Sequence, residues 1–262
     1  SALLGSISLA GVAFLATEGS MSETFVVLAF GYMIASIALI VGPSRTGMKV
    51  ERVVLEKKYE GEIVEYGRNS WVTSIGASLI WSRGELPLVK AYVGESAVGF
   101  YSIGITISGI LNQAVGLLTG ALWPQIAKFW SKPDKSELYV IFRTMTNMVM
   151  LLSSLAAGLL ICFSDHIVVI VFGKEFIDSS TLVQIFAIGG ITLTSGTAHL
   201  VLQAASNGRF SRNITLFAAP ALFCGAFILL PLFGPEGGAM ARVITQAGMA
   251  IITMLSVRKV FS

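Results

Sequence analysis

The sequence is poor in the residues on which most protein chemistry depends. It holds only two histidines and two cysteines, and 13% of its residues are charged, against about 25% in an ordinary soluble domain. Cys162 and Cys224 each lie in an apolar run, and we interpret both as packing residues, with neither a disulfide nor a metal site. Nucleophile-elbow, zinc-protease and Walker A motifs are missing too. We therefore expect a protein that is not an enzyme and that needs no cofactor.

Two further absences argue against a nucleic-acid-binding protein and against a signal peptide. The net charge is only +3, and no basic strip with interleaved aromatic residues occurs, so no nucleic-acid partner is expected. The chain opens at Ser1 without a methionine or a basic segment before its first apolar run. That opening does not fit a signal peptide, and we expect the chain to begin partway through a longer protein.

What the sequence does contain is long apolar runs. Hydrophobic residues make up 54% of the chain, and the mean hydropathy is +0.78. Because about 20 apolar residues span a membrane as a helix, the composition predicts an all-α, polytopic transmembrane helix bundle. The eight predicted spans are 2–17, 24–42, 68–92, 96–123, 139–162, 180–206, 212–232 and 236–257. A shorter run at 166–173 is predicted to be interfacial or re-entrant.

One charged segment divides these spans. Residues 43–67 form a charged linker, in which Val50–Glu62 is predicted to be an amphipathic helix at the membrane surface. The division is therefore 1–42 with two spans, the linker 43–67, and 68–262 with six spans.

The basic residues predict the orientation. With alternating loops, one side carries only Arg83, Lys90, Lys174 and Arg242 of the 18 basic residues, leaving the other fourteen opposite. The positive-inside rule places the fourteen-residue side in the cytoplasm. Both ends of the chain are then expected on the cytoplasmic side of the cell inner membrane.

Three charges interrupt the third span. On a continuous helix, Arg83 and Lys90 share an arc of about 100° with Asn69, while Glu85 points to the opposite face unless Pro87 breaks the helix. A membrane charge of this kind costs at least ~2.5–3.5 kcal/mol, so it should face protein or a water-filled cavity. Either Arg83 pairs with an acid such as Glu85 to hold helices together, or it lines a cationic cavity.

Other predicted helices carry polar faces. Asn112 and Gln113 belong to a stripe of small and polar residues, which is equally typical of close helix packing. His199 and Gln203 share a face of the sixth span, and a lone membrane histidine serves packing as often as binding. Arg242 lies near the outer end of the last span, where it can also snorkel to the surface. Together with the third span, four predicted helices each have one polar face, which favours a bundle around a hydrated cavity. Because this cavity would contain few carboxylates, its expected ligand is an anion.

Four landmarks resemble those of a known family. Leu79–Tyr101, the Trp-Pro-Gln at 123–125, Phe172–Phe176 and Phe233–Arg242 are similar, in this order, to conserved stretches of Wzx-type polysaccharide and O-antigen flippases. These flippases belong to the multidrug/oligosaccharidyl-lipid/polysaccharide exporter superfamily. The resemblance covers about residues 65–260 and departs from the family at Glu85, where aspartate is commoner.

The resemblance implies a family fold of 12 to 14 helices in two bundles. Residues 1–42 would end the N-terminal bundle, and 68–262 would form the C-terminal one. It further implies alternating-access export of a lipid-linked pyrophosphate oligosaccharide for lipopolysaccharide and other surface polysaccharides, with membrane lipids and a coupling ion (H⁺ or Na⁺) as partners. Arg83 would contact the headgroup, with Arg242, Lys90 and His199 as weaker candidates beside Glu85. The sugar would be hydrogen-bonded by Gln113, Asn112 and Gln203.

Three alternatives stay open at this point. A drug/cation antiporter of the same superfamily should depend on buried carboxylates, of which the predicted spans contain essentially only Glu85. A lipid II flippase is closer and is not excluded. A non-transporting membrane scaffold would need no cavity that water can reach.

Overall fold

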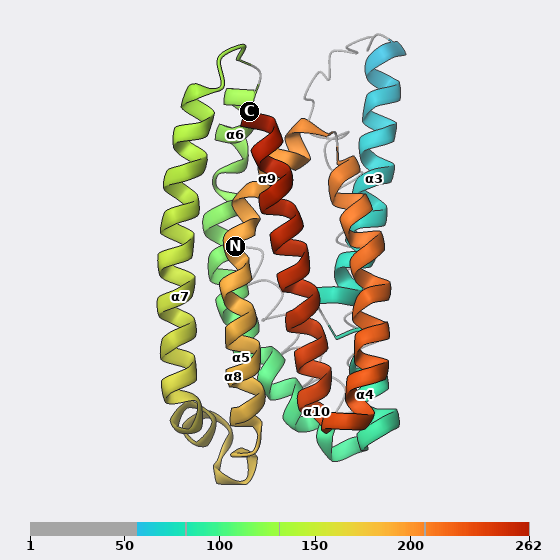
Figure 1. Ribbon diagram of the computed structural model, residues 1–262, viewed down its shortest axis with the longest axis vertical. Helices are drawn as coiled ribbons and strands as arrows, with labels where there is room; N and C mark the ends of the chain where they lie inside the picture. The colour runs from blue at the N-terminus through green and yellow to red at the C-terminus, as the bar shows by residue number, and fades with distance from the viewer. Residues whose placement is uncertain (1–56, 82, 131, 207, 262) are drawn as a thin grey trace, which may run out of the picture. The chain divides into compact units, whose positions relative to one another are not determined.

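The computed structural model describes residues 57–81, 83–130, 132–206 and 208–261, drawn in colour in Figure 1. The spans predicted at 2–17 and 24–42 and most of the predicted linker lie outside these residues. The described part belongs to one compact unit that begins at Glu56.

This part is helical and contains no strand among the residues described. Its elements are α3 (Lys57–Trp81), α4 (Leu86–Val93), α5 (Glu95–Gly120), α6 (Trp123–Trp130), α7 (Ser136–Phe172), the 3₁₀ helix η1 (Lys174–Phe176), α8 (Ser179–Gly190), the 3₁₀ helix η2 (Ile191–Thr194), α9 (Ser195–Ala205) and α10 (Arg209–Phe261). Four helical stretches are long and apolar enough to cross a membrane: Glu95–Trp130, Ser136–Phe172, Ser179–Ala205 and Arg209–Phe261. The predicted all-α membrane bundle is confirmed, and the protein is a multi-pass membrane protein.

Helix α10 is a hairpin of two antiparallel legs, seen as the orange and red helices of Figure 1. Gly234 has a φ of +61°, a left-handed conformation that glycine adopts without strain and that reverses the chain. A Cβ on Gly237 would lie 2.1 Å from the carbonyl oxygen of Leu229, so the legs meet backbone to backbone. The first leg (209–233) and the second leg (235–261) correspond to the spans predicted at 212–232 and 236–257.

The connections gather at two ends of the bundle, as alternating spans require. At one end the Phe261 ring lies 5.3 Å from Tyr139 and 5.4 Å from Phe142, which joins the end of α10 to the start of α7. At the other end Phe100 and Phe176 join the start of α5 to η1, with ring centroids 6.0 Å apart. We call the first the basic end, because the starts of α3, α7 and α10 and the C-terminal end of α10 bring most of the described basic residues there (Figure 1).

Two predicted segments differ from the structure. The span at 68–92 is broken, since α3 ends at Trp81 and residues 83–85 form a turn before α4. Pro87 lies in the first turn of α4, where its missing N–H leaves no intrahelical hydrogen bond unmade. The run predicted at 166–173 is not a separate piece, because its residues up to Phe172 continue α7, and its interfacial position stays a prediction. No proline or glycine interrupts α7 after Gly158, so the helix runs on for about 55 Å in all.

The helices bury two main cores. One, around Tyr101, Leu222 and Leu230, joins α4, α5, α8 and the hairpin turn region of α10. The other, around Leu138 and Val201, lies toward the basic end. Outside them, Leu117, Ile170 and Phe217 are 78%, 81% and 80% exposed. Large apolar side chains on the outer surface are what a hydrocarbon environment favours.

Candidate functional site

A buried ion pair joins the α3–α4 turn to the second leg of α10. Arg242 donates from Nη1 to Oε1 of Glu85 at 2.6 Å, and the side chains are 5% and 0% exposed. Tyr101 donates its hydroxyl to the same oxygen at 3.1 Å. The Arg242 guanidinium also lies 5.7 Å from the ring of Phe186. The α3–α4 turn, α5 and the second leg of α10 therefore meet at one carboxylate oxygen, and α8 contacts the arginine beside it.

Local structure explains how Glu85 reaches this position. Glu85 precedes α4, and its carbonyl accepts from the N–H groups of Leu88 and Val89, which fixes the turn. On the opposite side Gly238 lets the second leg of α10 approach, since a Cβ there would lie 3.3 Å from the Tyr101 ring. The glycines that close the hairpin thus also bring Arg242 within reach of Glu85.

The pair is an interhelical contact in this conformation. The second oxygen of Glu85, Oε2, is buried and has no hydrogen-bond partner among the described residues. Removing one member of a buried pair leaves an uncompensated charge, at a cost of about 3–5 kcal/mol. The alternative in which Arg83 pairs with Glu85 is wrong, because Glu85 pairs with Arg242 instead. Substrate contact by Glu85 and Arg242 stays a prediction that requires the pair to open.

Arg83 and Lys90 lie outside this buried cluster. The Arg83 side chain is exposed in the turn and makes no ion pair with any described residue. Lys90 pairs with Glu95 at 2.7 Å, with both side chains largely in the open. Because the helix breaks between Asn69 and Lys90, the single polar arc predicted for the third span is not formed. Arg83 is accessible to an anionic group, and its headgroup role stays a prediction.

The polar stripe of α5 is open in the described part of the chain. Gln113 is exposed and Asn112 partly so. A Cβ added at Gly109, Gly116 or Gly120 would meet no atom within 4 Å among these residues. The packing interpretation of the stripe therefore finds no partner helix here, while Gly104 on another face packs against Phe186.

The two α9 candidates bond to their own protein. His199 Nε2 and the Ser211 hydroxyl are 2.9 Å apart. Gln203 donates from Nε2 to the Tyr66 hydroxyl at 3.2 Å. These contacts tie α9 to the start of α10 and to α3, which favours the packing interpretation of His199. The eight predicted site residues are thus spread over the bundle, and only Glu85 and Arg242 are brought into contact.

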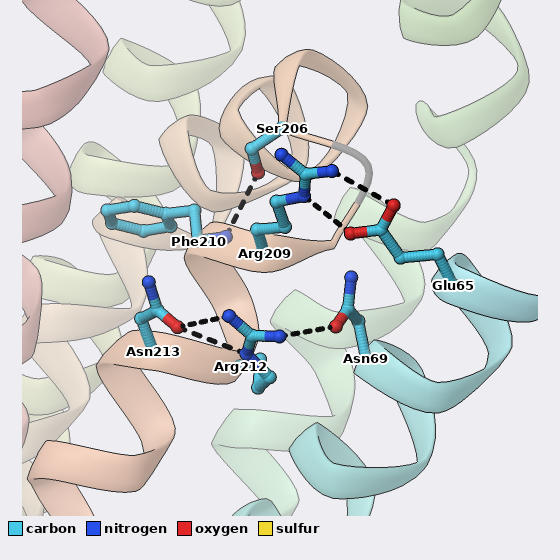
Figure 2. Close-up of polar contacts among 7 residues, drawn as sticks. All are labelled: Glu65, Asn69, Ser206, Arg209, Phe210, Arg212 and Asn213. Carbon is cyan, nitrogen blue, oxygen red and sulfur yellow. Dashed lines mark hydrogen bonds and ion pairs between the residues drawn. The ribbon is translucent and has the colours of Figure 1, made fainter. Parts of the chain in front are cut away.

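Sequence reasoning missed a polar network at the basic end (Figure 2). Arg209 donates to Glu65 from Nε and Nη2, at 2.6 and 2.9 Å. Arg212 donates to Asn69 at 2.9 Å and to Asn213 at 3.1 and 3.0 Å, and Figure 2 shows the arginines one above the other between α3 and α10. The hydrogen bonds from Arg209 hold the pKa of Glu65 below its ordinary value, which keeps the carboxylate ionised at neutral pH. Partners more than 140 residues apart leave no local pattern in the sequence.

An apolar groove runs along the α10 hairpin from this network. Its cavity of about 520 Å³ lies between the two legs. The residues that line it are Phe210, Asn213, Ile214, Phe217, Ala218, Ala221, Gly225, Leu229, Ala241, Ile244, Thr245, Gly248, Met249 and Ile252. Asn213 is both a lining residue and an acceptor from Arg212, so one end of the groove is polar while most of its lining is apolar.

The described residues contain no cluster of three or more His, Cys, Asp or Glu side chains that could hold a metal ion. The polar side chains described above form ion pairs and hydrogen bonds with one another.

Comparison with known proteins gives a relative among glycan biosynthesis proteins. The chain is similar to the probable low-salt glycan biosynthesis flippase Agl15 of Haloferax volcanii, with 25% identity over 238 residues and 89% of this chain covered. The chain spans 48% of that protein's length, about half. No protein-family profile matches the chain, and no solved structure matches it.

Proposed function

We propose that this chain forms one helical bundle of a flippase that moves a lipid-linked glycan across the cytoplasmic membrane by alternating access. The observation that carries the proposal is the similarity to a probable glycan biosynthesis flippase, which extends over nearly all of the chain. The cargo is a lipid with an anionic pyrophosphate headgroup, and the product serves cell-surface polysaccharide synthesis. Moving the lipid involves no covalent chemistry.

The α10 hairpin supports a lipid cargo. An apolar groove that ends at Asn213, whose side chain accepts hydrogen bonds from Arg212, matches a molecule with a hydrocarbon chain and a negatively charged head. The exposed Arg83 at the opposite end would meet the same headgroup after it has crossed. With the cell interior negative, outward movement of an anion gains about 2.3 kcal/mol per charge per 100 mV. In this scheme the hydrocarbon chain stays in the groove or the bilayer while the head passes the polar residues.

A transport assay tests the proposal directly. The full-length protein is reconstituted in liposomes with a fluorescent polyprenyl diphosphate sugar, and a membrane-impermeant quencher reports the fraction in the outer leaflet. We expect exchange between leaflets at least tenfold faster than in protein-free liposomes. A folded, reconstituted protein that leaves the exchange rate at the protein-free value would contradict the flippase and favour a scaffold. Equally fast movement of organic cations would favour an antiporter.

Filling the groove should separate its role from general destabilisation. Gly248 lines the groove, and a Cβ there would meet no atom within 4 Å among the described residues, so Gly248→Trp adds bulk where space exists. We expect this variant to fold but to lose at least tenfold in the exchange rate. Gly158→Trp on α7 is the matched control, since Gly158 is also helical and open but lies outside the groove. Equal exchange rates for the two variants would show that the lipid does not pass along the groove.

A further inference from the structure

A polar pocket at the basic end is separate from the α10 groove and from the network of Figure 2. It lies between the start of α7 and the C-terminal end of α10, with a cavity of about 310 Å³. Its polar lining residues are Tyr139, Arg143, Thr146, Asn147 and Arg258. The two arginines come from different helices, 115 positions apart in the sequence, so the pocket exists only in the folded bundle.

The charge of this pocket is of one sign. Arg143 and Arg258 both line it, and its lining contains no aspartate or glutamate. Neither arginine makes an ion pair within the part of the chain that the structure describes. This contrasts with Arg209 and Arg242, whose guanidinium groups are each engaged by a carboxylate. Two guanidinium groups beside the Tyr139 hydroxyl and the Asn147 amide form the donor set that suits a phosphate oxygen array.

The pocket has packed walls. The rings of Phe142 and Phe261 stack at 5.4 Å, and Tyr139 meets Phe261 edge-on at 5.3 Å. One turn further along α7 the hydroxyls of Thr146 and Thr197 are 2.7 Å apart, which ties α7 to α9. These contacts hold the backbones that carry the two arginines, so less ordering of the protein is needed when a ligand binds.

We propose that this pocket binds the phosphate group of an anionic membrane lipid. The phosphate lies between Arg143 and Arg258, and the lipid's glycerol or prenyl portion runs over the apolar lining residues Phe142 and Met254. The location supports a lipid ligand over a soluble one. Both helices are membrane-spanning candidates, and the α7 surface beside the pocket exposes Val140 and Met148, 61% and 55% exposed. This inference depends on the membrane location and not on the proposed transport.

Lipid retention tests the pocket. The full-length protein is purified in a mild detergent, and native mass spectrometry measures dissociation constants for phosphatidylglycerol and phosphatidylcholine. A polyprenyl diphosphate is titrated in parallel, to distinguish a resident phospholipid from the carrier of the glycan. We expect Arg143→Gln/Arg258→Gln to weaken binding of at least one anionic lipid tenfold or more, with phosphatidylcholine unchanged. The lipid affected identifies the source of the phosphate.

Two further variants keep the result interpretable. Lys174→Gln/Lys259→Gln removes the same amount of charge from exposed positions outside the pocket, and we expect its affinities to stay within twofold of the unsubstituted protein. Arg143→Lys/Arg258→Lys keeps the charge but loses the planar fork, so intermediate affinity is expected. Because both arginines are exposed, all variants should elute and unfold like the parent. Equal binding of every anionic lipid by the parent and the double glutamine variant would overturn the proposal.

Discussion

At the scale of single residues, the Glu85–Arg242 pair is the contact with the largest consequence for stability. Both side chains are almost fully buried, and Tyr101 shares the carboxylate oxygen. The exposed Lys90–Glu95 pair has the same kind of contact at 2.7 Å, yet its side chains are 62% and 83% exposed. Solvent screening leaves such a surface pair with little effect on stability. Burial, and not distance, separates the two pairs.

A double-mutant cycle should show this difference. We expect Glu85→Gln and Arg242→Gln each to destabilise the protein by about 3–5 kcal/mol, because each leaves the partner charge buried without compensation. The double variant should lose clearly less than the sum of the two. Thermal unfolding in detergent measures the three changes, with Lys90→Gln as a control expected near zero. Strictly additive losses would mean that the two residues do not act as a pair.

The residue scale is also where sequence reasoning reached its limit. Glu85 and Arg242 were both selected as unusual membrane charges, because a charge in an apolar run is visible locally. Their pairing was not, since 157 positions separate them and Arg83 lies much nearer to Glu85 in the sequence. For the same reason the Arg209–Glu65 contact was not predicted, since 144 positions separate the two residues. Helical periodicity describes one helix at a time, whereas a buried pair depends on how several helices pack.

At the scale of elements, the α10 hairpin was predictable and the α3–α4 break was only partly so. Phe233-Gly-Pro combines a residue that tolerates a positive φ with one that stops a helix, and the structure turns there. Pro87 likewise indicated where the third span could break, but α3 ends several residues before it, at Trp81. The span predicted at 139–162 is longer in the structure, since α7 continues through the polar and charged residues at 164–166 to Phe172. These residues do not interrupt the helix, because polar side chains remain compatible with helical backbone where no proline intervenes.

The close approach of the two α10 legs gives a prediction about the hairpin. Gly237→Ala should destabilise the protein, since the new Cβ would lie 2.1 Å from the Leu229 carbonyl oxygen and must push the legs apart. Gly248→Ala is the matched change, because its Cβ has open space and alanine favours a helix over glycine by about 1 kcal/mol. Thermal unfolding in detergent should therefore move in opposite directions for the two variants. A stability unchanged by Gly237→Ala would show that the hairpin is not closely packed there.

At the scale of the whole molecule, the alternation of the connections was predicted from the sequence and appears in the described part. The basic end collects the α6–α7 and α9–α10 connections and the C-terminal end of α10, whereas Arg83, Lys90, Lys174 and Arg242 lie toward the other end. This distribution is independent of the buried contacts, since most of the basic side chains involved are exposed. The distribution of basic residues therefore reflects how the chain inserts into the membrane, and helix packing alone does not require it.

The asymmetry predicts the orientation in the membrane. Translocation disfavours short loops rich in lysine and arginine, so the basic end should face the cytoplasm. The test uses a background in which the exposed Cys162 and Cys224 are replaced by serine. In intact cells a membrane-impermeant maleimide should label Glu175→Cys and leave Lys259→Cys unlabelled until the cells are lysed, since both positions are exposed but belong to opposite ends. Labelling of Lys259→Cys alone in intact cells would invert the topology. The Asn213 end of the groove would then face the outside, opposite to the direction of loading that the proposed glycan export requires.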